Sequence, residues 1–251
     1  MDYLSLTQAY YSAWIGRENV ISDSPAGIIF VESEERNKTQ YGYSDPMDLW
    51  LLHTGDRIFV SYGEKVKPKL EALQKSLSPG MTAAEMAPVL ADVLGKAPYR
   101  GVKYVYEGSQ KASTRAVVLT QKDVGLYLAF DNALYPSFGD ETEDQWAKEY
   151  FEDISAKGYC CGVIEDGILA SCTDAPGMPY MSDTIQEIGI NTLPAYRKKG
   201  YAADACLLAI SQIIQSGKCP IWATGIDNLP SQRLAKSIGF RVFGETLTLT
   251  L

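Results

Sequence analysis

The first hundred residues of the chain combine two hydrophobic patterns. Short apolar runs bounded by turn residues predict strands, and apolar residues three or four positions apart predict helices. We expect strands at 28–31, 49–53, 57–61 and 99–106, and helices at 66–77 and from 82 to about 94. Thr82-x-x-Glu85 is a capping-box pattern that opens the second helix. This part is therefore predicted to be mixed α and β, and none of its elements indicates a function.

From residue 113 onward the same patterns predict a longer series, in the order β-α-α-β-β-β-α-β-α-β-β. The Asp166-Gly167 pair between two apolar runs is a hairpin signal. The expected strands are 115–119, 159–164, 168–172, 184–192, 221–224 and an alternating run at 246–251. The expected helices are 121–131, 142–154, one that follows residues 197–202 and reaches about 215, and a short one that ends at Gly239.

A polar, glycine-containing stretch at 107–113 separates the two series, as a linker or long turn would. The length of 251 residues corresponds to one large domain or two ordinary ones. We therefore expect two domains, residues 1–112 and residues 113–251.

The charge balance restricts the partners. The chain has 23 basic and 31 acidic residues, a net charge of −8, which disfavours binding to nucleic acid. No apolar run reaches the roughly 18 residues that a membrane span needs. The first residues lack the basic start and long apolar core of a signal peptide, so we expect a cytoplasmic protein without a membrane partner.

Cysteine and histidine usage argues against a metal centre. The five cysteines are an odd number without a CxxC pair, so we expect reduced, mostly buried thiols and neither a disulfide framework nor a zinc ribbon. His53 is the single histidine and lies in an apolar strand pattern, which favours a structural role. A multi-histidine metal site is excluded, and we predict no metal.

The most informative local feature is a basic loop between a strand and a helix. Arg197, Lys198 and Lys199 precede Gly200 at the expected start of the helix. A helix N-terminus has unpaired N–H groups and a partial positive charge, and a glycine lets a phosphate approach the backbone closely. The loop is either a pyrophosphate site or a solvated basic turn.

Four segments of the second part carry a family resemblance when they are taken in order. They are 116–123, 190–196, the loop 197–202, which matches a (Q/R)xxGx(G/A) pyrophosphate motif, and 228–240, which ends in a Gly-Phe pair. Residues 113–251 thereby resemble the GNAT superfamily of acetyl-CoA-dependent N-acyltransferases. The resemblance implies an α/β (mixed α+β) fold of the GNAT acyltransferase type, with a splayed central mixed sheet. A smaller N-terminal α+β domain precedes it.

The resemblance also implies a cofactor site for acetyl-CoA. The strands at about 185–192 and 220–225 should splay apart, so that the pantetheine arm binds between them. The loop amides would hold the pyrophosphate, and Asn228 would contact the cofactor arm or serve only as a helix cap. The implied cofactor residues are Ile190, Asn191, Thr192, Arg197, Lys198, Lys199, Gly200, Tyr201, Ala202, Asn228 and Ser231.

Acetyl transfer needs a neutral amine, and a base must take its proton. Glu187 is the candidate base, unless it is an ordinary ion-paired or solvated glutamate. Strand alternation puts Gln186 on the opposite face, so direct base catalysis requires that Glu187 be the one facing the site. Ala235 stands where many family members have a tyrosine that protonates the leaving thiolate. Ser231, water or a tyrosine such as Tyr135 or Tyr159 would then supply the proton.

The expected wall of the acceptor pocket is formed by the first two helices of the second part. The acidic residues there, against a single Lys148, favour a cationic amine or merely solvate a helix. The acids are Asp140, Glu141, Glu143, Asp144, Glu149, Glu152 and Asp153, and the apolar candidates are Tyr135, Phe138 and Trp146.

Three functions remain open at this point. The first is an N-acetyltransferase that moves acetyl directly from acetyl-CoA to a small, cationic primary amine. The second is a non-catalytic acyl-CoA-binding or regulatory module. The third places the function in residues 1–112, as a degenerate GNAT-like half, a lid or a dimerisation surface. We expect a monomer or a homodimer.

Overall fold

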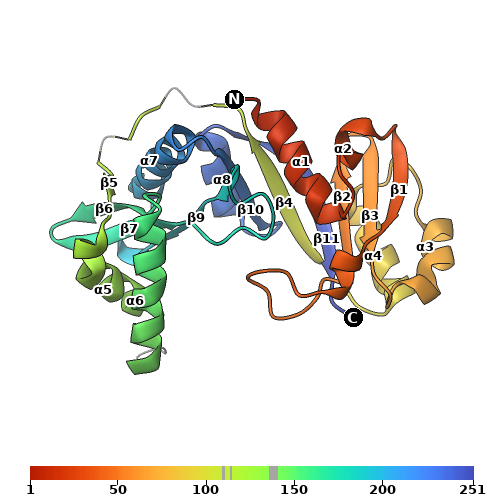
Figure 1. Cartoon of the computed structure of the whole chain (residues 1–251), viewed down its shortest axis with the longest axis horizontal. Coiled ribbons are helices and arrows are strands. Elements are labelled where there is room, and N and C mark those ends of the chain that lie inside the picture. Colours follow the sequence, from red (N-terminus) through yellow and green to blue (C-terminus); the bar gives the residue numbers. More distant parts are fainter. Residues whose placement is uncertain (109–110, 114, 136–140) are drawn as a thin grey trace.

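The fold is described from a computed structural model that covers residues 1–108, 111–113, 115–135 and 141–251, with the backbone alone at 141–144 (Figure 1). Residues 1–106 form four helices, four strands and two short 3₁₀ turns. In chain order these are α1 (Tyr3–Ile15), α2 (Val20–Asp23), β1 (Gly27–Glu32), η1 (Glu34–Asn37), β2 (Leu49–Thr54), β3 (Arg57–Tyr62), η2 (Lys67–Lys69), α3 (Leu70–Ser76), α4 (Ala83–Leu94) and β4 (Tyr99–Tyr106).

Helix α1 is the longest element that the hydrophobic pattern did not predict. Asp2 caps it by accepting from the Ser5 amide at 3.1 Å, and Gly16 ends it in the left-handed conformation, with φ 89°. Its buried face includes Thr7 and Ser12 beside aromatic residues, so polar and apolar positions do not separate as in an ordinary amphipathic helix. That face packs on strands β2, β3, β4 and β10.

The second part of the chain follows the predicted order except at the strand expected at 184–192 and at its last element. Its elements are β5 (Val117–Val118), η3 (Gln121–Asp123), α5 (Val124–Leu134), α6 (Glu141–Ala156), β6 (Cys161–Glu165), β7 (Ile168–Asp174), β8 (Ile185–Glu187), β9 (Gly189–Thr192), η4 (Pro194–Tyr196), α7 (Tyr201–Gln215), β10 (Cys219–Gly225), α8 (Leu229–Ser237) and β11 (Phe240–Leu249). The β6–β7 hairpin is confirmed, and Asp166 and Gly167 at its turn both have positive φ.

A seven-stranded sheet joins the two parts of the chain. Its order is β1-β3-β2-β11-β4-β10-β8. The prediction of two strands after the last helix is wrong, because one strand, β11, occupies residues 240–249. Strand β4, from residues 99–106, lies between β11 and β10 and pairs antiparallel with both. The sheet therefore contains strands from both sides of the polar stretch at 107–113 in the sequence (Figure 1).

The predicted splay of the two strands is confirmed. The expected single strand at 184–192 is divided at Ile188 into β8, which pairs parallel with β10, and β9, which pairs antiparallel with β7 in a four-stranded sheet of order β5-β6-β7-β9. The Ile188 amide still donates to the Ile221 carbonyl at 3.3 Å. Beyond that bond the chain turns from one sheet to the other, and β9 and β10 diverge.

The cysteine prediction is also confirmed. All five thiols are free and buried. His53 lies in β2, opposite Ile58 on β3 and Glu245 on β11. Among the described residues, no helix has the length and apolar character to cross a membrane.

Candidate active site

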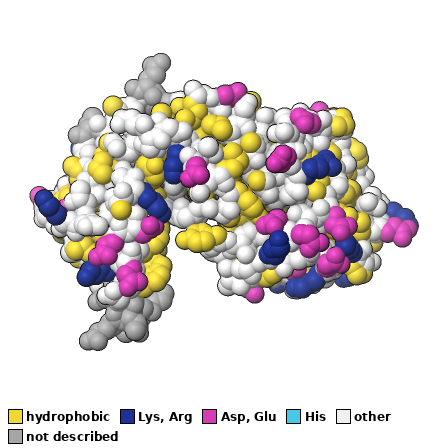
Figure 2. Space-filling view, in the orientation of Figure 1, with side chains coloured by type: hydrophobic (Ala, Val, Ile, Leu, Met, Phe, Trp, Pro, Cys, Tyr) yellow, Lys and Arg dark blue, Asp and Glu magenta, His cyan; other side chains and the backbone are white. Residues whose placement is uncertain are grey.

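A cleft of about 760 Å³ opens where β9 and β10 diverge, and helices α7 and α8 complete its walls. The sequence prediction of the cofactor residues coincides with this cleft except at Lys199. The predicted residues that line it are Ile190, Asn191, Thr192, Arg197, Lys198, Gly200, Tyr201, Ala202, Asn228 and Ser231. In the space-filling view the molecule is hollowed between its two lobes, and hydrophobic side chains gather around that hollow (Figure 2).

The loop before α7 presents its backbone amides to this cleft. Lys198 and Gly200 both have positive φ, 65° and 86°, and this conformation is uncommon for a lysine. The Asp204 amide is bonded to the Gly200 carbonyl at 3.2 Å, so the amides that precede it in the helix have no intrahelical acceptor. Their free N–H groups and the helix dipole favour an anion.

The side chains of the three cationic residues of the loop point in different directions: two toward the cleft and one away from it. Arg197 lines the cleft, and its Nε donates to the Thr192 carbonyl at 3.2 Å. Lys198 also lines the cleft. Lys199 turns to the β6–β7 hairpin, where its Nζ lies 3.3 Å from Glu165 Oε2 and 4.8 Å from the centre of the Tyr196 ring. Only its backbone remains available to the cofactor.

Arg115 supports the same loop and was not found from the sequence. Its Nε lies 2.6 Å from Asp204 Oδ2, and its Nη2 donates to the Lys199 carbonyl at 3.1 Å. Its guanidinium carbon is 4.6 Å from the centre of the Tyr201 ring. Arg115 thereby ties the start of α7 to the segment before β5. The sequence gives no signal for this contact, because the partners are 84 and 89 residues apart.

Asn228 and Ser231 lie at the start of α8, on the other side of the cleft. The Asn228 side chain accepts a hydrogen bond from the Ser231 amide at 3.2 Å, so it caps the helix. Asn228 also lines the cleft. The Ser231 hydroxyl accepts from Trp222 Nε1 at 3.1 Å. A hydroxyl that accepts in this way still has its own hydrogen to donate.

A second cavity has a volume of about 340 Å³. Ala223 and Thr224 of β10 line both cavities, so this part of the strand borders each of them. Aromatic side chains dominate the second cavity, and one acid and one base lie within it. The lining residues are Tyr10, Tyr11, Trp14, Tyr43, Tyr99, Gly101, Lys103, Glu187, Ala223 and Thr224.

Comparison with known proteins matches this architecture to one family. The family model described as GNAT acetyltransferase matches residues 82–248, more than half of the chain. The chain belongs to the GNAT acetyltransferase family. The match begins at Thr82, the cap of α4, and so includes α4 and β4, which the sequence analysis assigned to the first part.

Two solved structures illustrate the fold that this member of the GNAT acetyltransferase family shares with them. A GNAT-family acetyltransferase from Colwellia psychrerythraea is 15% identical, with a TM-score of 0.51 over 68% of this chain and 64% of that one. A GCN5-related N-acetyltransferase from Sphaerobacter thermophilus is 11% identical, with a TM-score of 0.52 over 67% and 56%. The chain thus spans less than two thirds of either structure. A comparison with curated proteins finds no match.

Glu187 faces the aromatic cavity of this GNAT acetyltransferase, and Gln186 points to the opposite side of the sheet. Gln186 is buried, and its side chain donates to the Pro176 carbonyl at 2.9 Å. Burial raises the pKa of Glu187; the charge of Lys103 opposes that rise, and Asp174 adds to it. A carboxyl whose pKa is raised toward neutrality is a better general base than an ordinary glutamate.

The sequence analysis expected helices α5 and α6 to form the wall of the acceptor pocket. Their described residues line neither of the two cavities above. Trp146 is 63% exposed. Asp153 Oδ2 lies 2.5 Å from Nζ of Lys157, the residue after the end of α6. Of the expected acceptor residues, Phe138 and Asp140 and the side chains of Glu141, Glu143 and Asp144 lie outside the described residues.

The position that usually holds a tyrosine is closed by packing. Ala235 is fully buried in one cluster with Tyr104 and Trp222. Neither tyrosine considered from the sequence lines the cleft: the Tyr159 hydroxyl lies 2.7 Å from Ser216 Oγ, and Tyr135 is largely exposed. Of the residues considered from the sequence as proton donors, Ser231 is the one in the cleft.

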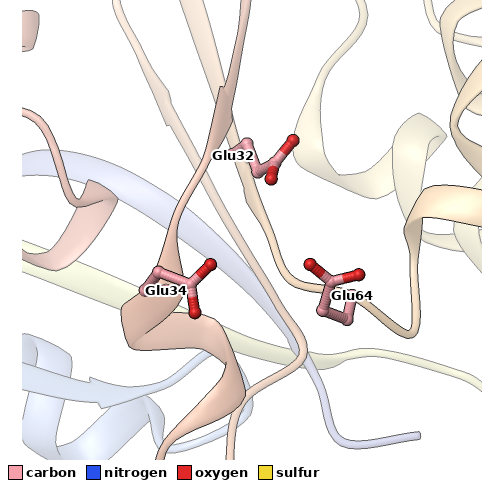
Figure 3. Close-up of side chains that lie close together, drawn as sticks. All are labelled: Glu32, Glu34 and Glu64. Carbon is pink, nitrogen blue, oxygen red and sulfur yellow. The ribbon is translucent and has the colours of Figure 1, made fainter.

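Three exposed carboxylates gather outside both cavities. Glu32, Glu34 and Glu64 bring their oxygens within 4.8 Å of one another (Figure 3). Lys67 Nζ lies 2.7 Å from Glu32 and 2.6 Å from Glu64, and these two bonds raise the pKa of the lysine. The chain therefore supplies its own counter-charge to this cluster.

Proposed function

We propose that this GNAT acetyltransferase transfers an acetyl group from acetyl-CoA directly to the primary amine of a small acceptor, within a ternary complex. The observation that carries the proposal is that Ala223 and Thr224 line both cavities, and that Glu187 faces the second of them. One cavity suits a long ligand with an anionic end, and the other suits a small amine.

The first cavity fits acetyl-CoA in its chemistry. The free amides at the start of α7 and the side chains of Arg197 and Lys198 would hold the pyrophosphate. Strand β9 pairs with β7 on one side and borders the cleft on the other, so its free backbone groups would bind the pantetheine amides as a neighbouring strand would. Acetyl-CoA supplies the acyl group and the thiolate leaving group.

In the transfer, the amine nitrogen bonds to the thioester carbonyl carbon and the carbon–sulfur bond breaks. Glu187 takes the proton that the amine must lose, and the departing thiolate is protonated from Ser231 or from water. Thiols have a pKa near 8.5, so the thiolate leaves without a strong acid. This tolerance is consistent with Ala235 in place of a tyrosine.

The state of the cysteines supports direct transfer. Burial raises the pKa of Cys161 to about 12 and that of Cys219 to about 11. Cys172 and Cys206 are also shifted upward, Cys172 chiefly by its contact with Cys160 and Cys206 by burial. Thiols of this kind are poor nucleophiles at neutral pH, which argues against an acetylated cysteine intermediate.

Residues 1–112 contribute the acceptor side in this proposal. Helix α1 and strand β4 provide Tyr10, Tyr11, Trp14 and Lys103 of the second cavity. The carboxylate of Glu187 and the aromatic faces would attract a protonated amine, in keeping with the cationic acceptor expected from the sequence.

The first test is a calorimetric titration of the purified chain with acetyl-CoA at physiological salt, followed by a screen of amines for thiol release. We expect saturable one-to-one binding and release of CoA with some primary amines. A folded protein that does not bind millimolar acetyl-CoA would refute the proposal at its first step.

The buried Ala235 also favours a second function, a non-catalytic acyl-CoA-binding or regulatory module. That function predicts the same binding isotherm without thiol release from any amine. The two functions are thus separated by the screen and not by the titration.

A further inference from the structure

We infer that the acceptor is a zwitterion: an amino acid or close analogue with a carboxylate beside its amine and an apolar, preferably aromatic, side chain. The inference rests on the proposed function and narrows its acceptor from a cation to a molecule with both charges. It is carried by the arrangement of Glu187, Lys103 and the aromatic residues in the second cavity.

The two charged residues lie on one face of the sheet, on either side of β10. Lys103 on β4 is in register with Ala223, and Glu187 on β8 is in register with Ile221. Neighbouring strands are about 4.8 Å apart and residues advance about 3.4 Å along a strand. The Cα atoms of Lys103 and Glu187 are thus roughly 12 Å apart by this geometry, and their side chains approach the same space from two sides.

The described residues form no ion pair within 4.0 Å that includes Lys103 or Glu187. Burial lowers the pKa of Lys103, and the charge of Glu187 raises it again. Two partly buried charges of opposite sign that line one cavity and do not touch leave room for a third group that pairs with both. A zwitterion satisfies both, with its ammonium at Glu187 and its carboxylate at Lys103.

The space between the two charges is kept open by small residues. Ala223 forms the floor beside Lys103, and Gly101 lines the cavity on β4. Because Ala223 also lines the cofactor cleft, an amine held at Glu187 would lie near the part of β10 that borders both cavities. A purely cationic acceptor would be repelled by Lys103 at the same place.

The aromatic wall is rigid and suits an apolar side chain. The Trp14 ring stacks on Trp50 at 5.9 Å, and the Tyr11 ring stacks on Phe243 at 5.4 Å. Tyr10, Tyr11 and Trp14 are buried, whereas Tyr43 and Tyr99 are exposed and mark the mouth. The volume of 340 Å³ is at the small end for ligand sites, which favours a single amino acid over an aminoglycoside or a peptide.

The experiment compares matched pairs that differ only by the carboxylate: phenylalanine and phenethylamine, tyrosine and tyramine, leucine and isopentylamine. Thiol release from acetyl-CoA gives kcat/KM for each. We expect each amino acid to exceed its amine by about tenfold to a hundredfold, as the loss of one charge-assisted hydrogen bond predicts. Lys103→Met should abolish this preference, chiefly by a higher KM for the amino acid.

Lys75→Met is the charge-matched control. Lys75 is exposed on α3 and pairs with Glu71 at 2.6 Å, so the variant removes one positive charge away from both cavities. It should keep the wild-type preference in all three pairs. A preference that changes equally in both variants would point to net charge and would overturn the inference.

The remaining outcomes separate the inference from the proposed function. If the amines are acetylated as well as the amino acids, or better, the inference is wrong and the proposed function stands. If no compound is acetylated, the proposed function fails, and phenylalanine is titrated calorimetrically in the presence of CoA. Binding to the wild type and not to Lys103→Met supports the zwitterion site, whereas no binding to the wild type refutes it.

Discussion

The two cavities of this molecule share two residues of β10, yet they are built in different ways. The cofactor cleft depends on backbone: free amides at a helix start, a loop with two positive φ values and the free side of β9. The cavity proposed for the acceptor depends on side chains from α1, β4, β8 and β10 and on Tyr43. A site made of backbone recognises a constant group of the cofactor, whereas a site made of side chains can change its acceptor by substitution.

The strongest way to test this division is Glu187→Gln. The variant keeps the size of the side chain and removes the base, so kcat should fall by about 10²- to 10⁴-fold. Affinity for acetyl-CoA should stay near the wild-type value, because Glu187 lines only the acceptor cavity. Steady-state kinetics and calorimetry measure the two effects. Glu71→Gln, an exposed change on α3, is the control, and a similar loss in both variants would deny Glu187 its role.

The pH dependence of kcat is a second test of Glu187 as the general base. A base works in its deprotonated form, and burial raises the pKa of Glu187 above its ordinary value of 4.5. kcat should therefore fall about tenfold per pH unit below that raised pKa. The acidic limb should disappear from the pH–rate profile of the residual activity of Glu187→Gln. An unchanged limb would assign the titration to another group.

On the cofactor side, two neighbouring lysines form a matched pair. Lys198→Ala removes a cation that lines the cleft and should weaken acetyl-CoA binding about tenfold, as loss of one charge-assisted contact does. Lys199→Ala removes the same charge from a side chain that pairs with Glu165, and its effect should be smaller. Calorimetric titration of both variants gives the comparison. Equal losses would mean that net charge alone acts.

The last prediction concerns stability and expects no effect on the rate. Ala235→Tyr restores the usual family residue, but Ala235 is fully buried against other core side chains. Overpacking of this kind costs about 1–3 kcal/mol, which a denaturant titration would detect. We expect no gain in kcat. A more active and equally stable variant would show that the cleft has room for a tyrosine there.

The difference between the cavities also explains what the sequence could reveal. The loop at 197–202 is contiguous, and its chemistry follows from a helix start, a glycine and adjacent cations, so it could be predicted. Strand 99–106 was predicted as an element, but its partners are more than a hundred residues away and no local pattern specifies them. Helix α1 escaped prediction because buried threonine, serine and tyrosine blur its apolar face.

The cavity proposed for the acceptor could not be predicted from the sequence for the same reason. Acidic residues at 140–153 gave a strong compositional signal, whereas the residues that line the cavity are single aromatics and one lysine spread from Tyr10 to Thr224. Only Glu187 was named in advance, because its strand continues directly into the cofactor loop. A site made of contiguous residues could therefore be predicted from the sequence. A site made of residues that the fold brings together from distant positions could not.

The central place of β4 has a consequence for synthesis of the chain. Residues 99–106 leave the ribosome long before β10 and β11, their neighbours on both sides, have been made. At about 5–20 residues per second, both edges of β4 stay unpaired for several seconds or more. Unpaired strand edges invite aggregation. The nascent chain must therefore be shielded until residue 249 has emerged, and truncation before β10 would leave those edges permanently open.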